Sequence, residues 1–199
     1  MSDAPSQGRS VVLATRNPHT VVEMRRLHEP AGLAAEPLPD EVELPPEDGR
    51  TFADNAMLKA GAAAAATGRP AIADDSGIEA TSLGGAPGVW SARYASPTAT
   101  DEENLEKLVA EAPADSRLRY VCALAYVNPE TGEERVFFGD SRGRLARERA
   151  GTNGFGYDPV FVPDATGDNR TMAELTDAEK DAISHRGHAV RALTRWLRL

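Results

Sequence analysis

The stretch Pro70-Ala-Ile-Ala-Asp-Asp-Ser-Gly77 joins a short apolar run to two adjacent carboxylates. The apolar run favours a buried strand, and we expect that strand to end where Asp74 and Asp75 begin a loop. Neighbouring side chains of an extended chain point in opposite directions, so one carboxylate can face a bound cation while the other faces backbone or a second ligand. Asp-Ser-Gly is also common in surface turns, so the stretch alone leaves a metal site and an acidic turn as alternatives.

The composition predicts one globular domain that does not grip polymeric nucleic acid. The chain has 199 residues, 41% of them hydrophobic, which is enough for a sizeable core. We expect residues 1–9 to form a flexible N-terminal segment and residues 10–199 a single two-lobed domain. The net charge of −9 argues against a basic nucleic-acid surface, although a local basic pocket can still hold a small phosphorylated ligand.

The cysteine content and the lack of long apolar runs predict a cytoplasmic protein. Cys122 is the only cysteine, so no internal disulfide can form, and we expect this residue in the core of a protein from a reducing compartment. No apolar run approaches the roughly 18 residues that cross a membrane, and the first ten residues lack a signal-peptide core. We therefore expect no membrane partner.

The N-terminal part of the chain predicts a strand, a loop and a helix. The run Ser10-Val-Val-Leu-Ala14 favours a buried strand, and Thr15-Arg16-Asn17-Pro18-His19-Thr20 a loop before a helix that begins near Val21. Such a loop presents backbone N–H groups and a helix N-terminus to an anion, and Thr15 and Asn17 can bind phosphate or a base. Because the loop lacks the glycines and lysine of a Walker sequence, an ordinary connection fits equally well.

Residues 36–48 are acidic and rich in proline, which predicts an extended loop or edge segment. Within it, Glu47 lies just before a turn and can reach the same cation as Asp75. Thr51 and Asp54 have the spacing of a capping box and predict a helix over residues 52–66.

Asn55 and Lys59 are four residues apart and share one face of that helix. A buried Lys59 would pair with the carboxylates or with a phosphate, whereas base rates favour a solvated surface lysine.

The middle of the chain predicts a hairpin and hence a mixed sheet. Thr100 and Glu103 form a second capping-box pattern, for a helix that ends near Ala112. Residues 118–127 and 135–139 favour two strands joined by a turn at 128–132, which makes an antiparallel pair.

The run Gly151-Thr-Asn-Gly-Phe-Gly-Tyr-Asp-Pro159 has unusual backbone freedom. Such a loop can hold Phe155 or Tyr157 against a flat base, while Asp158 or backbone groups such as Gly156 bind the base edge. The tip of a glycine-rich hairpin is the alternative.

A third capping-box pattern, Thr176 with Glu179, places Lys180 on a short helix. His185 and Arg186 follow near the start of the last helix, where cations oppose the helix dipole, so we expect them to share an anion. The sequence contains no zinc-ligand spacing and no legible Ser-His-Asp arrangement, which favours chemistry at an oxygen-ligated metal.

Five blocks in one order resemble the inosine triphosphate pyrophosphatases, and the likeness covers nearly the whole chain. The blocks are Ala14–Asn17, Thr51–Ala60, Ala73–Gly77 with Gly84–Gly88 and Ser91–Tyr94, Gly154–Pro159, and Ala173–Gly187. The resemblance implies an α/β fold with an elongated mixed sheet flanked by helices, and two lobes around a central nucleotide cleft. It also implies a homodimer that uses Mg²⁺ to hydrolyse ITP, dITP and XTP to the monophosphate and pyrophosphate.

The resemblance assigns a role to each candidate residue. It implies Asp75, Asp74 and Lys59 for catalysis, with Asp75 and Glu47 as ligands of Mg²⁺. It implies contacts with the purine nucleoside triphosphate from Thr15, Arg16, Asn17, Asn55 and Ser76 on the phosphate side, and from Phe155, Gly156, Tyr157, Asp158, Lys180, His185 and Arg186 on the base and sugar side.

The first loop departs from the family pattern, which commonly runs Thr-Gly-Asn-x-Gly-Lys. Thr20 stands where the family has lysine, so either Arg16 or His19 replaces that cation or the phosphate affinity is lower. Two other functions stay open: a nucleotide-binding module without catalysis, and a pyrophosphatase for pyrimidine or modified nucleotides.

Overall fold

The computed structural model describes residues 10–198, so the flexible segment expected at 1–9 lies outside the described residues. Its centre is a mixed sheet in the order β2-β1-β3-β4-β5-β6. The strands are β1 Ser10–Leu13, β2 Ala34–Pro37, β3 Ala71–Ala80, β4 Arg117–Asn128, β5 Glu133–Leu145 and β6 Phe161–Pro163. The first three pair in parallel, and β3 through β6 pair antiparallel. The predicted α/β class with a mixed sheet is confirmed.

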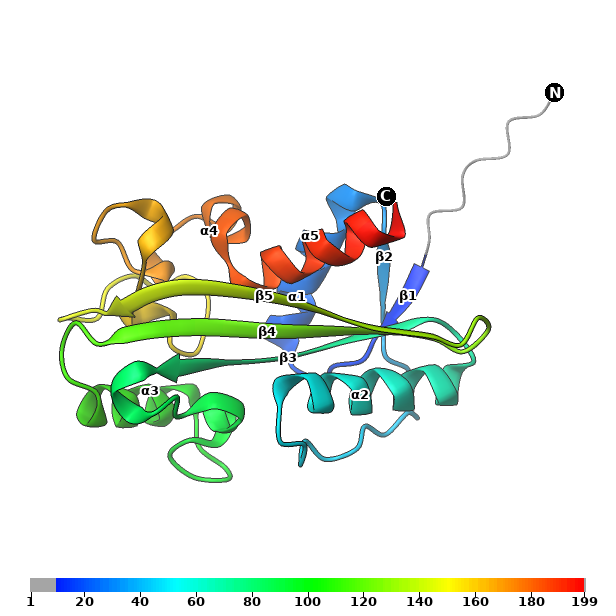
Figure 1. Ribbon diagram of the computed structural model, residues 1–199, viewed down its shortest axis with the longest axis horizontal. Helices are drawn as coiled ribbons and strands as arrows, with labels where there is room; N and C mark the ends of the chain where they lie inside the picture. Colours follow the sequence, from blue (N-terminus) through cyan, green and yellow to red (C-terminus); the bar gives the residue numbers. More distant parts are fainter. Residues whose placement is uncertain (1–9, 199) are drawn as a thin grey trace.

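Helices cover both faces of this sheet (Figure 1). They are α1 Pro18–His28, α2 Phe52–Thr67, α3 Asp101–Glu111, α4 Asp177–Ile183 and α5 His185–Leu197. One core joins the alanine-rich side of α2 to the sheet, and another joins α1 and α5 to the opposite face. Cys122 is fully buried in the second of these cores, as predicted.

All three predicted capping boxes are confirmed, at the starts of α2, α3 and α4. The predicted hairpin is also confirmed, with Cys122 of β4 opposite Gly139 of β5. Strand β5 is much longer than residues 135–139, because its polar residues 140–144 continue the ladder with β4. A Cβ at Gly139 would lie 2.1 Å from the His185 carbonyl oxygen, so glycine there allows the start of α5 to pack on the sheet.

Two predicted boundaries were wrong. Asp74 and Asp75 do not end a strand, because β3 pairs with β4 along its whole length, from Ala71 to Ala80. Strand β1 pairs with β3 only through Ala71 and Ile72, so the edge of β3 that carries the carboxylates extends beyond β1.

Helix α1 begins at Pro18 instead of near Val21. The Asn17 side chain caps it by accepting hydrogen bonds from the backbone N–H groups of His19 and Thr20, and proline fits the first helical position. The start of α1 therefore lies inside the predicted loop.

Candidate active site

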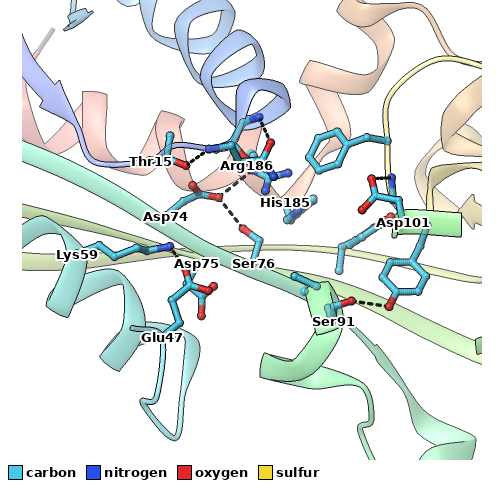
Figure 2. Close-up of a pocket in the computed structure, with 18 of the residues that line it drawn as sticks. Thr15, Glu47, Lys59, Asp74, Asp75, Ser76, Ser91, Asp101, His185 and Arg186 are labelled. Atoms are coloured by element: carbon cyan, nitrogen blue, oxygen red, sulfur yellow. Dashed lines mark hydrogen bonds and ion pairs between the residues drawn. The ribbon is translucent and has the colours of Figure 1, made fainter. Parts of the chain in front are cut away.

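A cavity of ≈ 430 Å³ lies where the central strands meet the loop before α1, the segment before α2, the glycine-rich loop and the start of α5. Figure 2 shows the carboxylates of Asp74 and Asp75 between Lys59 on one side and Arg186 on the other. Of the predicted site residues, Asn55 is the exception that does not line this cavity. The cavity lining that the sequence analysis missed includes Ser91, Asp101 and Tyr120.

The Asp75 carboxylate accepts a hydrogen bond from a side chain of helix α2. Asn55 Nδ2 on α2 donates to Asp75 Oδ2 at 2.9 Å, and Asn55 Oδ1 accepts from the backbone N–H of Gly49 at 2.8 Å. The Asn55 amide is therefore engaged with the protein, which differs from the expected phosphate contact. Burial raises the pKa of Asp75 to about 6, and the charges of Glu47 and Asp74 add to the rise against the opposing effect of Lys59 and Asn55.

Lys59 is buried and has a carboxylate partner. Of the two alternatives for this residue, the buried lysine is therefore confirmed over the solvated surface lysine. Its ammonium forms a salt bridge with Glu47, whose backbone carbonyl accepts a hydrogen bond from Arg93 at 2.8 Å. Burial favours the neutral amine, but the charges of Asp74 and Glu47 outweigh it and raise the pKa of Lys59. The lysine is thus charged beside the acidic centre.

The two carboxylates beside Lys59, those of Asp75 and Glu47, suit Mg²⁺ only if substrate and water supply its other ligands. Within residues 10–198, no set of three or more His, Cys, Asp and Glu side chains is placed to hold a metal alone. Mg²⁺ commonly takes one or two protein carboxylates and completes its octahedron with waters and phosphate oxygens. Asp75 and Glu47 provide two. Burial is the main cause of the raised pKa of Asp75, and the negative charges of Glu47 and Asp74, which a divalent cation would balance, add to it.

A chain of buried charged groups connects the acidic centre with the glycine-rich loop. Arg186 Nε donates to Asp74 Oδ2 at 2.9 Å, and its Nη1 donates to Glu23 Oε2 at 3.2 Å. Lys180 Nζ donates to Glu23 Oε1 at 2.5 Å and to Asp158 Oδ2 at 2.6 Å. All five side chains are buried, so Glu23 on α1 is the acid that the two cations share.

Glu23 was missed because nothing in its neighbourhood of α1 distinguishes it from a surface glutamate. The anion expected beside His185 and Arg186 is supplied by the protein, in Glu23 and Asp74. Burial lowers the pKa of His185 far below its usual value, and its ring stacks on Tyr120 at 4.6 Å between centroids and 6° between planes. His185 is therefore neutral and is not one of the cations.

The two aromatic residues of the glycine-rich loop have different surroundings. Tyr157 is buried and donates a hydrogen bond from its hydroxyl to the Ser91 carbonyl at 2.7 Å, which fastens the loop. Phe155 is half-buried, and its neighbours Gly154 and Gly156 both have positive φ. The Lys180 ammonium and the Arg186 guanidinium lie 5.4 and 5.3 Å from the centroid of the Phe155 ring. Phe155 is thus the aromatic face available to a flat ligand.

Arg16 and His19, the two candidate replacements for the family lysine, both contact other parts of the protein. Arg16 donates to the backbone carbonyls of Leu38, Pro39, Asp40 and Val42, at 3.0, 2.6, 3.3 and 2.8 Å. The His19 ring is stacked on Phe155. Thr20 is buried and lines the cavity, so the position of the family lysine faces the site without a charge.

If ITP is a substrate, as the family resemblance implies, we expect Thr20→Lys to lower its KM with little change in base specificity, because the new ammonium enters the cavity from the first turn of α1. The measurement is the KM for ITP and for ATP in wild type and variant. An unchanged or raised KM would mean that the site does not use a cation at this position.

We also expect kcat/KM to fall as the pH drops through about 6, where Asp75 takes up a proton. A protonated carboxylic acid neither binds a cation well nor accepts a proton from water. Because Mg²⁺ competes with that proton, raising its concentration should move the midpoint to lower pH. A midpoint that does not respond to Mg²⁺ would assign the titration to another group.

The fold and the cavity define an α/β protein whose mixed sheet carries a pocket with an acidic centre at one end and an aromatic and cationic surface at the other. The chain belongs to the Ham1 family, whose sequence model matches residues 11–196. This finding confirms the family that the five sequence blocks indicated.

Named relatives and solved structures agree with the family. The chain is 47% identical over 191 residues to the dITP/XTP pyrophosphatase of Cutibacterium acnes, covering 92% of this chain and 93% of the relative. It is 46% identical to the dITP/XTP pyrophosphatase of Yersinia pseudotuberculosis, covering 96% and 98%. The structure of a HAM1 protein from Coxiella burnetii matches with a TM-score of 0.83 and 40% identity, over 96% of this chain and 98% of that one.

No helix among residues 10–198 has the length and apolar character needed to cross a bilayer.

Proposed function

We propose that this protein is a Mg²⁺-dependent hydrolase that cleaves the bond between the α- and β-phosphates of ITP, dITP and XTP, releasing the monophosphate and pyrophosphate. This reaction removes deaminated purine nucleotides from the nucleotide pool. The observation that carries the proposal is the Lys59–Glu47 ion pair beside the buried carboxylate of Asp75, in a cavity of nucleotide size. The names of the similar proteins from Cutibacterium acnes and Yersinia pseudotuberculosis support it.

The acidic centre can supply the chemistry of this reaction. Asp75 and Glu47 would hold Mg²⁺, which when bound neutralises phosphate charge and favours attack by water. Asp75, whose Oδ2 accepts a hydrogen bond from Asn55, would accept the proton of that water. Lys59 keeps its charge beside the carboxylates and can stabilise the negative charge that develops on the phosphate oxygens.

The far end of the cavity can distinguish a 6-oxo purine from adenine. The Lys180 ammonium has three N–H donors, of which Glu23 and Asp158 take two, so one is left for a base. A 6-oxo group accepts that hydrogen bond, whereas the 6-amino group of adenine is a donor and would leave the third N–H of the ammonium without an acceptor. Phe155 offers the stacking face beside it.

The test is the release of pyrophosphate from ITP, dITP, XTP, GTP, ATP and dUTP, with Mg²⁺ and after its removal with a chelator. We expect kcat/KM for the 6-oxo substrates ITP and XTP to exceed that for ATP by on the order of 10²-fold or more. Activity should disappear with the chelator and return with added Mg²⁺. Release of single phosphate, a preference for GTP, ATP or dUTP, or no release at all, would contradict the proposal.

We extend the proposal to the state of the chain: a single two-lobed domain over residues 10–199, acting as a homodimer in the cytoplasm. One sheet that runs from the first strand to the last supports the single domain, and the buried free thiol of Cys122 suits a reducing compartment. Light scattering on the purified protein should give twice the chain mass of 21.2 kDa, and a mass of one chain would contradict the dimer.

A further inference from the structure

We propose that His19 is a positioning residue for the nucleobase: its imidazole supports the Phe155 ring from behind, so that the opposite face of the ring is held ready for the purine. The inference rests on the proposed function, because it requires Phe155 to be the surface on which the base stacks. It assigns a role to a residue that stands where the family loop commonly has glycine.

The first observation is the geometry of the two rings. The His19 and Phe155 centroids are 5.1 Å apart and their planes differ by 17°, which is a stacked arrangement within the usual range of aromatic pairs. A base cannot lie between two rings that are already stacked on each other. While this pair is intact, a purine that stacks on Phe155 must use the other face of the ring, in the neighbourhood of Lys180 and Arg186, which lie 5.4 and 5.3 Å from the ring centroid.

The second observation is the position of each residue relative to the cavity. Phe155 lines the cavity, and so do Asn17 and Thr20 on either side of His19 in the sequence, whereas His19 itself is exposed and lies outside the lining. On this proposal the imidazole covers the side of the Phe155 ring that lies away from the cavity.

The third observation is that both partners are fixed independently of each other. The His19 backbone N–H donates to the capping Asn17 side chain at 2.9 Å. On the other side, the Phe155 backbone N–H donates to Asp158 Oδ2 at 3.1 Å, and the Gly156 N–H donates to Asp101 Oδ2 at 3.1 Å. The stacked pair therefore joins the start of α1 to the glycine-rich loop, and its loss would free the Phe155 ring without unfolding either element.

A role for His19 as a phosphate-binding cation is the competing explanation, and the two roles require different side chains. A ring that supports Phe155 can be replaced by another aromatic ring but not by lysine. A cation that binds phosphate can be replaced by lysine but not by phenylalanine. The variants His19→Phe, His19→Lys and His19→Ala therefore separate the two roles.

The experiment measures kcat and KM for ITP in these variants, together with the inhibition constant of inorganic tripolyphosphate, which has phosphates but no base. We expect His19→Ala and His19→Lys to raise KM about three- to tenfold, the size of one aromatic contact, with kcat nearly unchanged. His19→Phe should keep the wild-type KM, and the tripolyphosphate constant should stay the same in all three. The exposed His188 on α5 gives the matched control, His188→Ala, with wild-type KM.

A wild-type KM in His19→Ala or in His19→Lys, or a raised KM in His19→Phe, would overturn the inference. A weaker tripolyphosphate inhibition in His19→Ala would do the same, because it would place the imidazole at the phosphates. Phe155→Ala separates this failure from that of the proposed function. If Phe155→Ala raises KM and His19→Ala does not, only the role of His19 is wrong; if Phe155→Ala has no effect, the base does not stack there.

Discussion

Asp75→Asn is expected to lower kcat for pyrophosphate release by about 10³-fold, while the protein remains folded. Asparagine has nearly the same shape, and its side-chain oxygen can still accept the hydrogen bond that Asn55 donates to Asp75. It cannot accept a proton from water, and it is a much weaker ligand for Mg²⁺ than a carboxylate. Because the pKa of Asp75 is raised by burial and by neighbouring carboxylates, removing its charge should not destabilise the fold.

The measurement is steady-state pyrophosphate release together with thermal unfolding of the same preparations. Glu79→Gln is the matched control, because Glu79 lies on the same strand, pairs with Arg119 near the surface and does not line the cavity. We expect that control to keep wild-type kcat. Residual activity in Asp75→Asn above about a tenth of the wild-type value would remove Asp75 from the catalytic role, since general-base loss costs far more.

Glu23→Ala is expected to destabilise the fold by about 3 kcal/mol, because Lys180 and Arg186 stay buried and lose the carboxylate they share. Lys180 keeps its ion pair with Asp158, and Arg186 keeps its ion pair with Asp74. The expected loss of free energy is therefore at the lower end of the range for a broken buried ion pair. In a chain of this length, the loss corresponds to a fall in melting temperature of roughly 6–12 °C. Chemical denaturation at pH 7 measures the change in free energy of unfolding.

The acid dependence of stability gives a second readout for Glu23. Burial favours the neutral acid, but the charges of Arg186 and Lys180 outweigh it and lower the pKa of Glu23 in the folded protein. A carboxylate with a lowered folded pKa stabilises the fold above its unfolded value of 4.5, and this contribution is lost as the pH falls through the folded pKa. The difference in free energy of unfolding between wild type and Glu23→Ala should therefore become smaller as the pH falls through the folded pKa of Glu23.

The matched control is Glu29→Ala, at an exposed position just after α1. It should leave the free energy of unfolding within about 0.5 kcal/mol of wild type, as surface substitutions usually do. Equal stability of Glu23→Ala and Glu29→Ala would contradict the buried network as described.

The predictable parts of the fold depend on residues close together in the sequence. The capping boxes that begin α2, α3 and α4 were legible because their residues are three apart and act on one turn of helix. The start of α1 was placed too late, although Asn17 followed by Pro18 is a cap signal, because the two residues were interpreted as part of an anion-binding loop.

The parts that were missed depend on distant pairings. Asp74 and Asp75 lie within a strand because β4, some fifty residues later, continues to pair with β3 after β1 has ended. Glu23 of α1 contacts Lys180, 157 residues away in sequence, because Arg26 of α1 forms ion pairs with Asp177 and Asp181 of α4, the helix that carries Lys180. The sequence blocks predicted most of the residues that line the cavity. Only the fold shows that Lys180 and Arg186 are already paired with protein carboxylates.

The most direct test of the acidic centre as the site of hydrolysis uses ITP in ¹⁸O-enriched water with Mg²⁺, followed by mass spectrometry of both products. If Asp75 and its neighbours direct water to the α-phosphorus, the label appears in inosine monophosphate and the pyrophosphate is unlabelled. Label in pyrophosphate, or products that consist of inosine diphosphate and single phosphate, would contradict the account.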